Sequence, residues 1–121
     1  MKVKRKTLDS IAPRQSVKLL INGEIRNVIT QGWKYENLVV IPESDFHLTS
    51  WMIVHKLSGI PVISSKYSCI AFSDNNPKIC STVESVRAIA LLLSKVGVPD
   101  KITEKTGIML RQLFEEAGIT K

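Results

Sequence analysis

The sequence predicts an α+β domain: an antiparallel β-meander of five or six strands, followed by two C-terminal helices packed on one face. Apolar residues recur with the period of strands in the first half and of helices in the second half. The 121 residues, 44% of them hydrophobic, suffice for one hydrophobic core. We expect a basic arm over residues 1 to 15 and one domain over 16 to 121, with strands in about 16 to 72 and helices at about 82 to 96 and 100 to 117.

The first two strands are predicted on either side of Asn22 and Gly23. The flanking segments, SVKLLI at residues 16 to 21 and EIRNVIT at 24 to 30, are both rich in Val, Ile and Leu. Asn-Gly between two such runs is the strongest short-range signal for a β-hairpin. A hairpin is therefore expected directly after the basic arm.

The later strands are shorter, and turn residues separate them. They are expected at residues 38 to 41, 51 to 57, 60 to 64 and 67 to 72. Pro42 closes the first of these, and Glu43 begins a turn. Alternation after Trp51 places His55 on the same face as that tryptophan. Pro61 predicts an edge position or a β-bulge, because proline cannot donate to a strand ladder.

Two helices are expected after a loop rich in Asp, Asn and Pro. Ser81 and Glu84 have capping-box spacing, so the first helix should begin at Thr82 and end at Gly97. Its apolar stripe, which Leu91 and Leu92 widen, consists of Val83, Val86, Ile89, Ala90 and Leu93. The second helix follows Pro99 and carries a stripe of Ile102, Met109, Leu110, Leu113, Phe114 and Ala117. Both stripes are expected to face the sheet.

The positive charge is concentrated at the N-terminus. The chain has a formal net charge of +6, of which residues 1 to 18 carry +5. The basic residues of the predicted arm are Lys2, Lys4, Arg5, Lys6 and Arg14. They can neutralise the phosphates of a nucleic acid, or they can belong to a solubilising terminus.

Nothing in the sequence has the pattern of an enzyme, and no cofactor or metal is expected. No loop has the glycine spacing of a phosphate-binding motif, and Cys69 and Cys80 are too few for a zinc site. His47 falls in a turn, and His55 is expected to be a hydrogen-bonded structural histidine; a small hydrolase using His55 is the weakest alternative. The longest apolar run, residues 88 to 93, is far shorter than a membrane span, and the N-terminus does not resemble a signal peptide. A cytoplasmic protein with no membrane partner is expected.

Aromatic and basic residues recur together along the predicted sheet. They are Arg26, Trp33, Lys34, Tyr35, Trp51, Lys56, Lys66 and Tyr67. Aromatic rings beside Lys or Arg can stack on a base and hold its phosphate, so this set is the predicted ligand-binding site. The alternative is that both tryptophans anchor the core.

The two helices also invite comparison with a helix-turn-helix, which would make the protein a DNA-binding regulator. That motif needs a basic recognition helix. The second helix instead has surplus acid, since Asp100, Glu104, Glu115 and Glu116 outnumber Lys101, Lys105 and Arg111. An αα-hairpin packed on the sheet is the expected arrangement.

The segment from Trp51 through His55 to Ser58 and Gly59 resembles a pattern of small phage and prophage proteins. In these, a strand begun by tryptophan reaches a histidine and then a Ser-Gly or Thr-Gly turn. The layout of a sheet followed by two helices is similar to that of phage anti-Thoeris sponge proteins, which sequester a nucleotide-derived immune signal. These resemblances imply a phage-type accessory protein in the cytoplasm of the host cell.

The expected function is therefore non-catalytic counter-defence by binding a phosphate-bearing ligand. The ligand would be a sequestered nucleotide signal or a nucleic acid. The alternative is a protein-interaction module that inhibits a host or immune enzyme through its apolar helical face. Exposed strand edges further predict a homo-oligomer.

Overall fold

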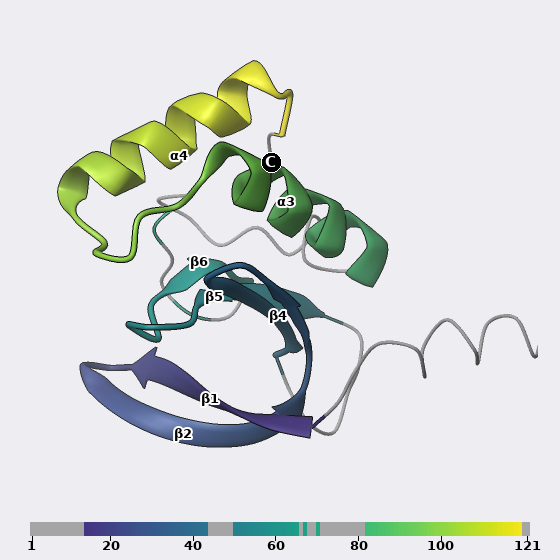
Figure 1. The fold of residues 1–121 in the computed structure, drawn as a ribbon, viewed down its shortest axis with the longest axis vertical. Coiled ribbons are helices and arrows are strands. Elements are labelled where there is room, and N and C mark those ends of the chain that lie inside the picture. Colours follow the sequence, from purple (N-terminus) through teal and green to yellow (C-terminus); the bar gives the residue numbers. More distant parts are fainter. Residues whose placement is uncertain (1–13, 44–49, 66, 68–69, 71–81, 120–121) are drawn as a thin grey trace, which may run out of the picture.

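The computed structural model describes residues 14–43, 50–65, 67, 70 and 82–119. A four-stranded antiparallel sheet forms the middle layer (Figure 1). A two-stranded hairpin lies on one side of this sheet, and two helices lie on the other. The predicted α+β class is confirmed, with the strands divided between two sheets.

The hairpin consists of β1 (Arg14–Ile21) and β2 (Glu24–Gln31), which are antiparallel with Ile21 opposite Glu24. Asn22 and Gly23 form the predicted turn, with φ angles of 52° and 83°. Positive φ at both central residues gives the backbone twist that two strands joined by a two-residue turn require.

The middle sheet has the order β3 (Trp33–Tyr35), β4 (Leu38–Pro42), β5 (Trp51–His55) and β6 (Pro61–Ile63). The short β3 was not predicted as a separate strand. Gly32 separates it from β2 where the chain crosses from the hairpin to the sheet. A Cβ atom on Gly32 would lie 2.6 Å from the Val40 carbonyl oxygen, so only glycine fits this close approach.

Strands β4 and β5 are buried on both faces. Leu38, Val40 and Ile53 pack with the helices in one cluster, whereas Val39 and Met52 pack with the hairpin in a second cluster. Alternate residues of a strand point to opposite faces, so both faces of these strands must be apolar. This explains why their sequences are nearly continuous apolar runs rather than alternating patterns.

The prediction for Pro61 is also confirmed. It begins β6 at an edge of the described sheet, and the pairing with β5 shifts register between Ile53 and Val54. The strand predicted at residues 67 to 72 falls mostly outside the described residues. Its described members, Tyr67 and Ile70, are not in a strand, although the Ile70 amide donates to the Pro61 carbonyl at 3.1 Å.

Helix α3 (Val83–Val96) covers the sheet with Val86, Ile89, Ala90 and Leu93. It ends as predicted at Gly97, whose φ is 96° and whose amide donates to the Leu93 carbonyl at 2.9 Å. Its N-cap is Thr82, which makes no side-chain cap bond, and Ser81 of the predicted capping box lies outside the described residues.

Helix α4 (Glu104–Glu116) starts four residues later than predicted. Its first turn is closed by a capping box between Thr103 and Thr106 that the sequence analysis did not identify. Leu110 and Phe114 of the predicted stripe are buried in the helix-side cluster, whereas Ala117 is exposed. In the part of the chain that the structure describes, neither helix has the length and apolar character needed to cross a membrane.

Gly59 contacts the backbone of β1, which allows a matched test of this packing. Its φ is 78°, and a Cβ atom there would lie 3.2 Å from the backbone nitrogens of Leu19 and Leu20. Gly23 has a similar φ of 83° but open space around it.

We expect Gly23→Ala to lower the free energy of unfolding by about 1 kcal/mol through backbone strain alone. Gly59→Ala should cost about 2 to 3 kcal/mol, because the methyl group also pushes β1 away.

The measurement is urea denaturation of both variants followed by circular dichroism. Equal losses for the two variants would show that Gly59 does not hold the β1 backbone in close contact.

Candidate functional site

The two tryptophans of the predicted site lie side by side within the core. Their ring centroids are 5.2 Å apart at an interplanar angle of 55°. Trp33 is 6% exposed and Trp51 is 8% exposed, and both belong to the cluster that packs under the helices. The alternative that they are core anchors is the one that the structure supports. Their faces do not form an open platform for a base.

Arg87 of α3 completes this aromatic group, and the sequence analysis did not select it. Its guanidinium carbon lies 4.8 Å from the Trp33 ring centroid and 5.7 Å from that of Tyr35. Its Nε–H donates to the Tyr35 hydroxyl at 2.5 Å. The signal was present in the sequence, because Arg87 directly follows Val86 and so borders the apolar stripe of the helix. The cation thus occupies the aromatic surface on which a ligand would have stacked.

These contacts do not provide a hydrogen-bond acceptor for the indole N–H of Trp33. Its Nε1 atom is buried and has no hydrogen-bond partner among the residues that the structure describes. An indole nitrogen can only donate, so the Arg87 guanidinium cannot serve as its acceptor.

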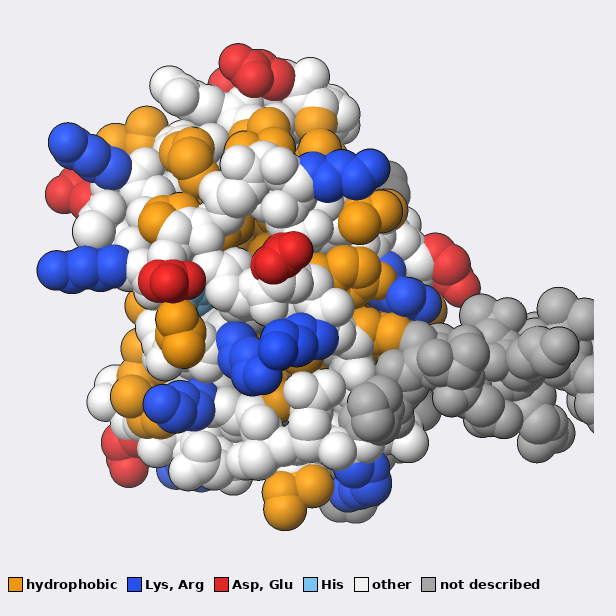
Figure 2. Space-filling view, in the orientation of Figure 1, with side chains coloured by type: hydrophobic (Ala, Val, Ile, Leu, Met, Phe, Trp, Pro, Cys, Tyr) orange, Lys and Arg blue, Asp and Glu red, His pale blue; other side chains and the backbone are white. Residues whose placement is uncertain are grey.

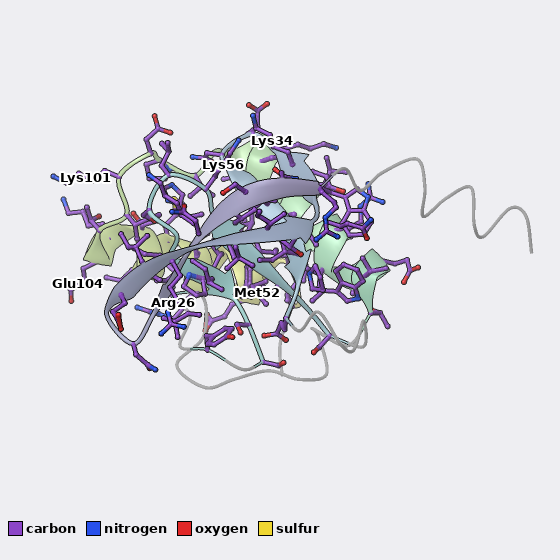
Figure 3. The ribbon with its side chains drawn as sticks, turned by 90° about the horizontal axis from the view of Figure 1, so that it is seen from below. Arg26, Lys34, Met52, Lys56, Lys101 and Glu104 are labelled. Atoms are coloured by element: carbon purple, nitrogen blue, oxygen red, sulfur yellow. The ribbon has the colours of Figure 1, made fainter. Side chains whose placement is uncertain are left out.

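Lys34 and Lys56 are brought together at the rim of the middle sheet. Lys34 of β3 is opposite Val39 of β4, which is opposite Val54 of β5. Val39 and Val54 pack with the hairpin, so Lys34 lies on the hairpin side of the sheet. Lys56 follows two residues after Val54, and its amide donates to the Asn37 carbonyl at 2.8 Å. Figure 3 shows the two labelled lysines next to each other, away from Arg26 and Met52. We call Lys34 and Lys56 the lysine pair.

Lys34 is close enough to Lys56 to affect the protonation of the Lys56 amine. A hydrogen bond with Lys34, and then repulsion by its charge, lowers the pKa of Lys56 below the usual 10.5, and desolvation adds to the effect. No carboxylate contributes to this shift. The folded protein therefore holds two cations together, and the surroundings of Lys56 disfavour the charged form of its amine.

The other predicted ligand residues do not join the lysine pair. Arg26 is exposed on β2, and Figure 3 shows it well apart from Lys34. Tyr67 is half-buried against the hairpin-side cluster, and its amide donates to the Ser64 hydroxyl at 2.9 Å. Lys66 lies outside the described residues.

The basic arm falls almost entirely outside the described part of the chain. Arg14, its one described cation, is exposed at the start of β1. Lys2, Lys4, Arg5 and Lys6 lie outside the described residues.

His55 is fully buried, and both of its ring nitrogens are engaged. Nε2 donates to the Pro99 carbonyl at 3.0 Å, and Nδ1 accepts from the Ser58 hydroxyl at 2.7 Å and from the Ser58 amide at 3.3 Å. Ser and His at this distance could in principle form a nucleophile and base. Here the Ser58 hydroxyl also accepts from the Ile60 amide, and the imidazole is oriented by a backbone carbonyl. The predicted structural role of His55 agrees with these contacts. His47 lies outside the described residues.

Glu43 is a buried carboxylate that the sequence analysis had placed in a turn. Its Oε2 accepts from the Ser64 hydroxyl at 2.5 Å and from the Ser65 amide at 3.0 Å, and its Oε1 accepts from the Ser65 hydroxyl. These bonds join the end of β4 to the segment that follows β6. The burial of Glu43 was not evident from the sequence, because its serine partners lie more than 20 residues further along the chain.

Neither the described side chains nor the comparisons with known proteins identify a known kind of site. Among the described residues, no three side chains of the His, Cys, Asp and Glu types come together in a way that could hold a metal ion. No protein-family model matches the chain, and no curated protein or solved structure is significantly similar to it.

The contact within the lysine pair predicts a specific titration behaviour. Lys34→Gln removes the neighbouring charge, so the pKa of Lys56 should rise toward 10.5. In the wild-type protein the unfolded chain binds more protons than the folded chain between the lowered pKa and 10.5, so stability should increase with pH through that window. This increase should shrink in Lys34→Gln.

The pKa is measured from the pH dependence of the Lys56 side-chain NMR signals. Lys101→Gln is the matched control, because Lys101 lies apart from the pair in Figure 3 and does not contribute to the shift. An unchanged Lys56 titration in Lys34→Gln would contradict the proximity of the two amines.

Proposed function

We propose that the protein is a non-catalytic binding protein that holds a phosphate-bearing ligand at the lysine pair. The observation that supports this proposal is the juxtaposition of Lys34 and Lys56, in which Lys34 lowers the pKa of Lys56 and no carboxylate offsets that shift. Two like charges held together destabilise the fold, and an anion bound between them would remove the repulsion. Such a pair gains most from a ligand with two or more negative charges, such as a phosphate group.

The surface around the pair is consistent with an exposed site of this kind. Figure 2 shows Lys and Arg side chains gathered near the middle of one face, with acidic side chains above them. Lys34 is exposed, and Lys56 is partly exposed. Asp100, a carboxylate on the α3–α4 connection, accepts a hydrogen bond from Asn37 Nδ2 at 3.3 Å.

A role as a phage counter-defence protein is part of this proposal and depends on the sequence resemblance stated above. Sequestration of a nucleotide signal requires affinity without turnover. The burial of His55 and the hydrogen bonds of Ser58 favour binding over hydrolysis, because both side chains are already engaged within the fold. The site would then act through charge and shape alone.

Binding is tested by calorimetry with two probes, ATP and a single-stranded 12-nucleotide DNA. Lys34→Gln and Lys56→Gln should each weaken binding by about tenfold or more, since each removes one of two cations that contact the phosphates. Lys101→Gln should leave the affinity within about twofold. Binding should also be accompanied by proton uptake at high pH, because an anion raises the pKa of Lys56.

The same titrations distinguish the two kinds of ligand. In a variant with Lys2, Lys4, Arg5 and Lys6 all replaced by Gln, ATP affinity should barely change. DNA affinity should fall if the arm contacts phosphates, with a salt dependence flatter by about 0.7 per lost contact on a single strand. Equal affinities of wild type, Lys34→Gln and Lys56→Gln for both probes would contradict the proposed site.

A further inference from the structure

The outer edge of β2 has backbone groups with no partner among the described residues. In the described part of the chain, β2 pairs with β1 on one side only. The two-residue turn makes hydrogen-bonded and non-hydrogen-bonded pairs alternate along the hairpin, and Leu20 with Ile25 is a non-hydrogen-bonded pair. The Leu20 amide accordingly points away from β2 and donates to the Gly59 carbonyl at 2.8 Å. By the same alternation, the amides and carbonyls of Ile25, Asn27 and Ile29 point away from β1.

The side chains of the same residues form an exposed apolar surface. Ile25 is 60% exposed and Ile29 is 63% exposed, the highest values for large hydrophobic residues in the described part of the chain. Both lie on the face of the hairpin that is turned away from the core, two residues on either side of Asn27. Figure 1 shows β2 as the strand farthest from the helices. The edge of β2 and the exposed apolar surface are therefore both centred on Asn27.

We propose that this edge pairs with the β2 edge of a second copy of the chain, antiparallel and with Asn27 on the two-fold axis. Ile25 of each copy then lies opposite Ile29 of the other, and Asn27 lies opposite its own equivalent. All three are hydrogen-bonded pairs, since the backbone groups of these residues point toward the edge. The two hairpins become one continuous four-stranded antiparallel sheet.

Charge and hydrophobic matching select this register over its neighbours. A register centred on Arg26 would place two arginine side chains directly opposite each other, which is destabilising. One centred on Val28 would pair each isoleucine with a polar residue, Asn27 or Gln31. One centred on Ile25 would run into the turn at Asn22 and Gly23. Only the register centred on Asn27 pairs isoleucine with isoleucine twice and opposes no like charges.

The size of this contact sets the concentration at which it forms. Three hydrogen-bonded pairs supply about six backbone hydrogen bonds. The contact is smaller than a standard interface, which buries about 1,600 Å² in total, so we expect dissociation in the micromolar range. The N-terminal arm and the lysine pair are not needed for it, so this proposal is independent of the proposed function.

Sedimentation equilibrium of the full chain at about 5 to 200 µM tests the dimer. Wild type should be dimeric at the upper concentrations. Ile29→Lys should raise the dissociation constant at least tenfold, because two lysines would be placed at the new strand pairing. Ile108→Lys is the matched control, since Ile108 is an exposed isoleucine of α4, 47% exposed, away from this edge. A wild-type monomer at 200 µM, or equal dissociation constants for the two variants, would overturn the proposal.

Oxidative cross-linking tests the register in a background with Cys69→Ser and Cys80→Ser. Asn27→Cys should form a disulfide-linked dimer, because directly opposite residues of paired strands have Cα atoms about 5.5 Å apart. Lys18→Cys should not, although Lys18 is opposite Asn27 on β1, because three strand spacings separate it from its equivalent. Cross-linking that is equal at both positions, or absent at position 27 in a dimeric sample, would overturn the proposed two-fold axis.

Discussion

The structure depends on the burial of β4 and β5 on both of their faces. A sheet of four short strands that is apolar on both sides cannot be stable in water unless each face is covered. The hairpin covers one face with Val17 and Leu19, and α3 covers the other with Val86, Ala90 and Leu93. The positions of the helices and of the hairpin therefore follow from one requirement, and the two hydrophobic clusters lie back to back across the same two strands.

Polar side chains then determine how the covering elements are attached. Asn37, in the β3–β4 turn, donates to the Val98 carbonyl at 2.6 Å, and His55 donates to the Pro99 carbonyl from the end of β5. Both bonds hold the α3–α4 connection against the same end of the sheet. Because these groups are partly or fully buried, losing one partner would leave the other without a hydrogen bond, which costs more than the bond contributes in water. Hydrophobic burial thus stacks the hairpin, the sheet and the helices, and these hydrogen bonds fix the position of the α3–α4 connection on the sheet.

The positively charged side chains have different environments in the core and at the rim of the sheet. Arg87 is held over Trp33 and bonded to the Tyr35 hydroxyl, so its charge serves the aromatic part of the core. Lys34 and Lys56 have no such partner among the described residues, and Lys34 repels the charge of Lys56 at the rim of the sheet. The two cases differ in their affinity for an anion. Arg87 is already stabilised within the fold, whereas the lysine pair would be stabilised by binding an anion. The edge of β2 is comparable, because its exposed isoleucines and its amides that are unpaired within the described residues would also gain from a binding partner.

Several features could be predicted from the sequence, because each depends on local periodicity, on a backbone φ angle or on a missing amide. They are the α+β class, the Asn22–Gly23 hairpin, the two helices and the bulge beside Pro61. The candidate site was predicted only in part. Lys34 and Lys56 were both selected, but their contact depends on strand register, which places residues 22 positions apart on one face. The sequence could not decide whether Trp33 faces solvent or core, because β3 is too short to show a period, and the burial of Glu43 depends on serines after β6. Tertiary structure settled these points, since burial of a side chain is a property of what packs against it and not of its neighbours along the chain.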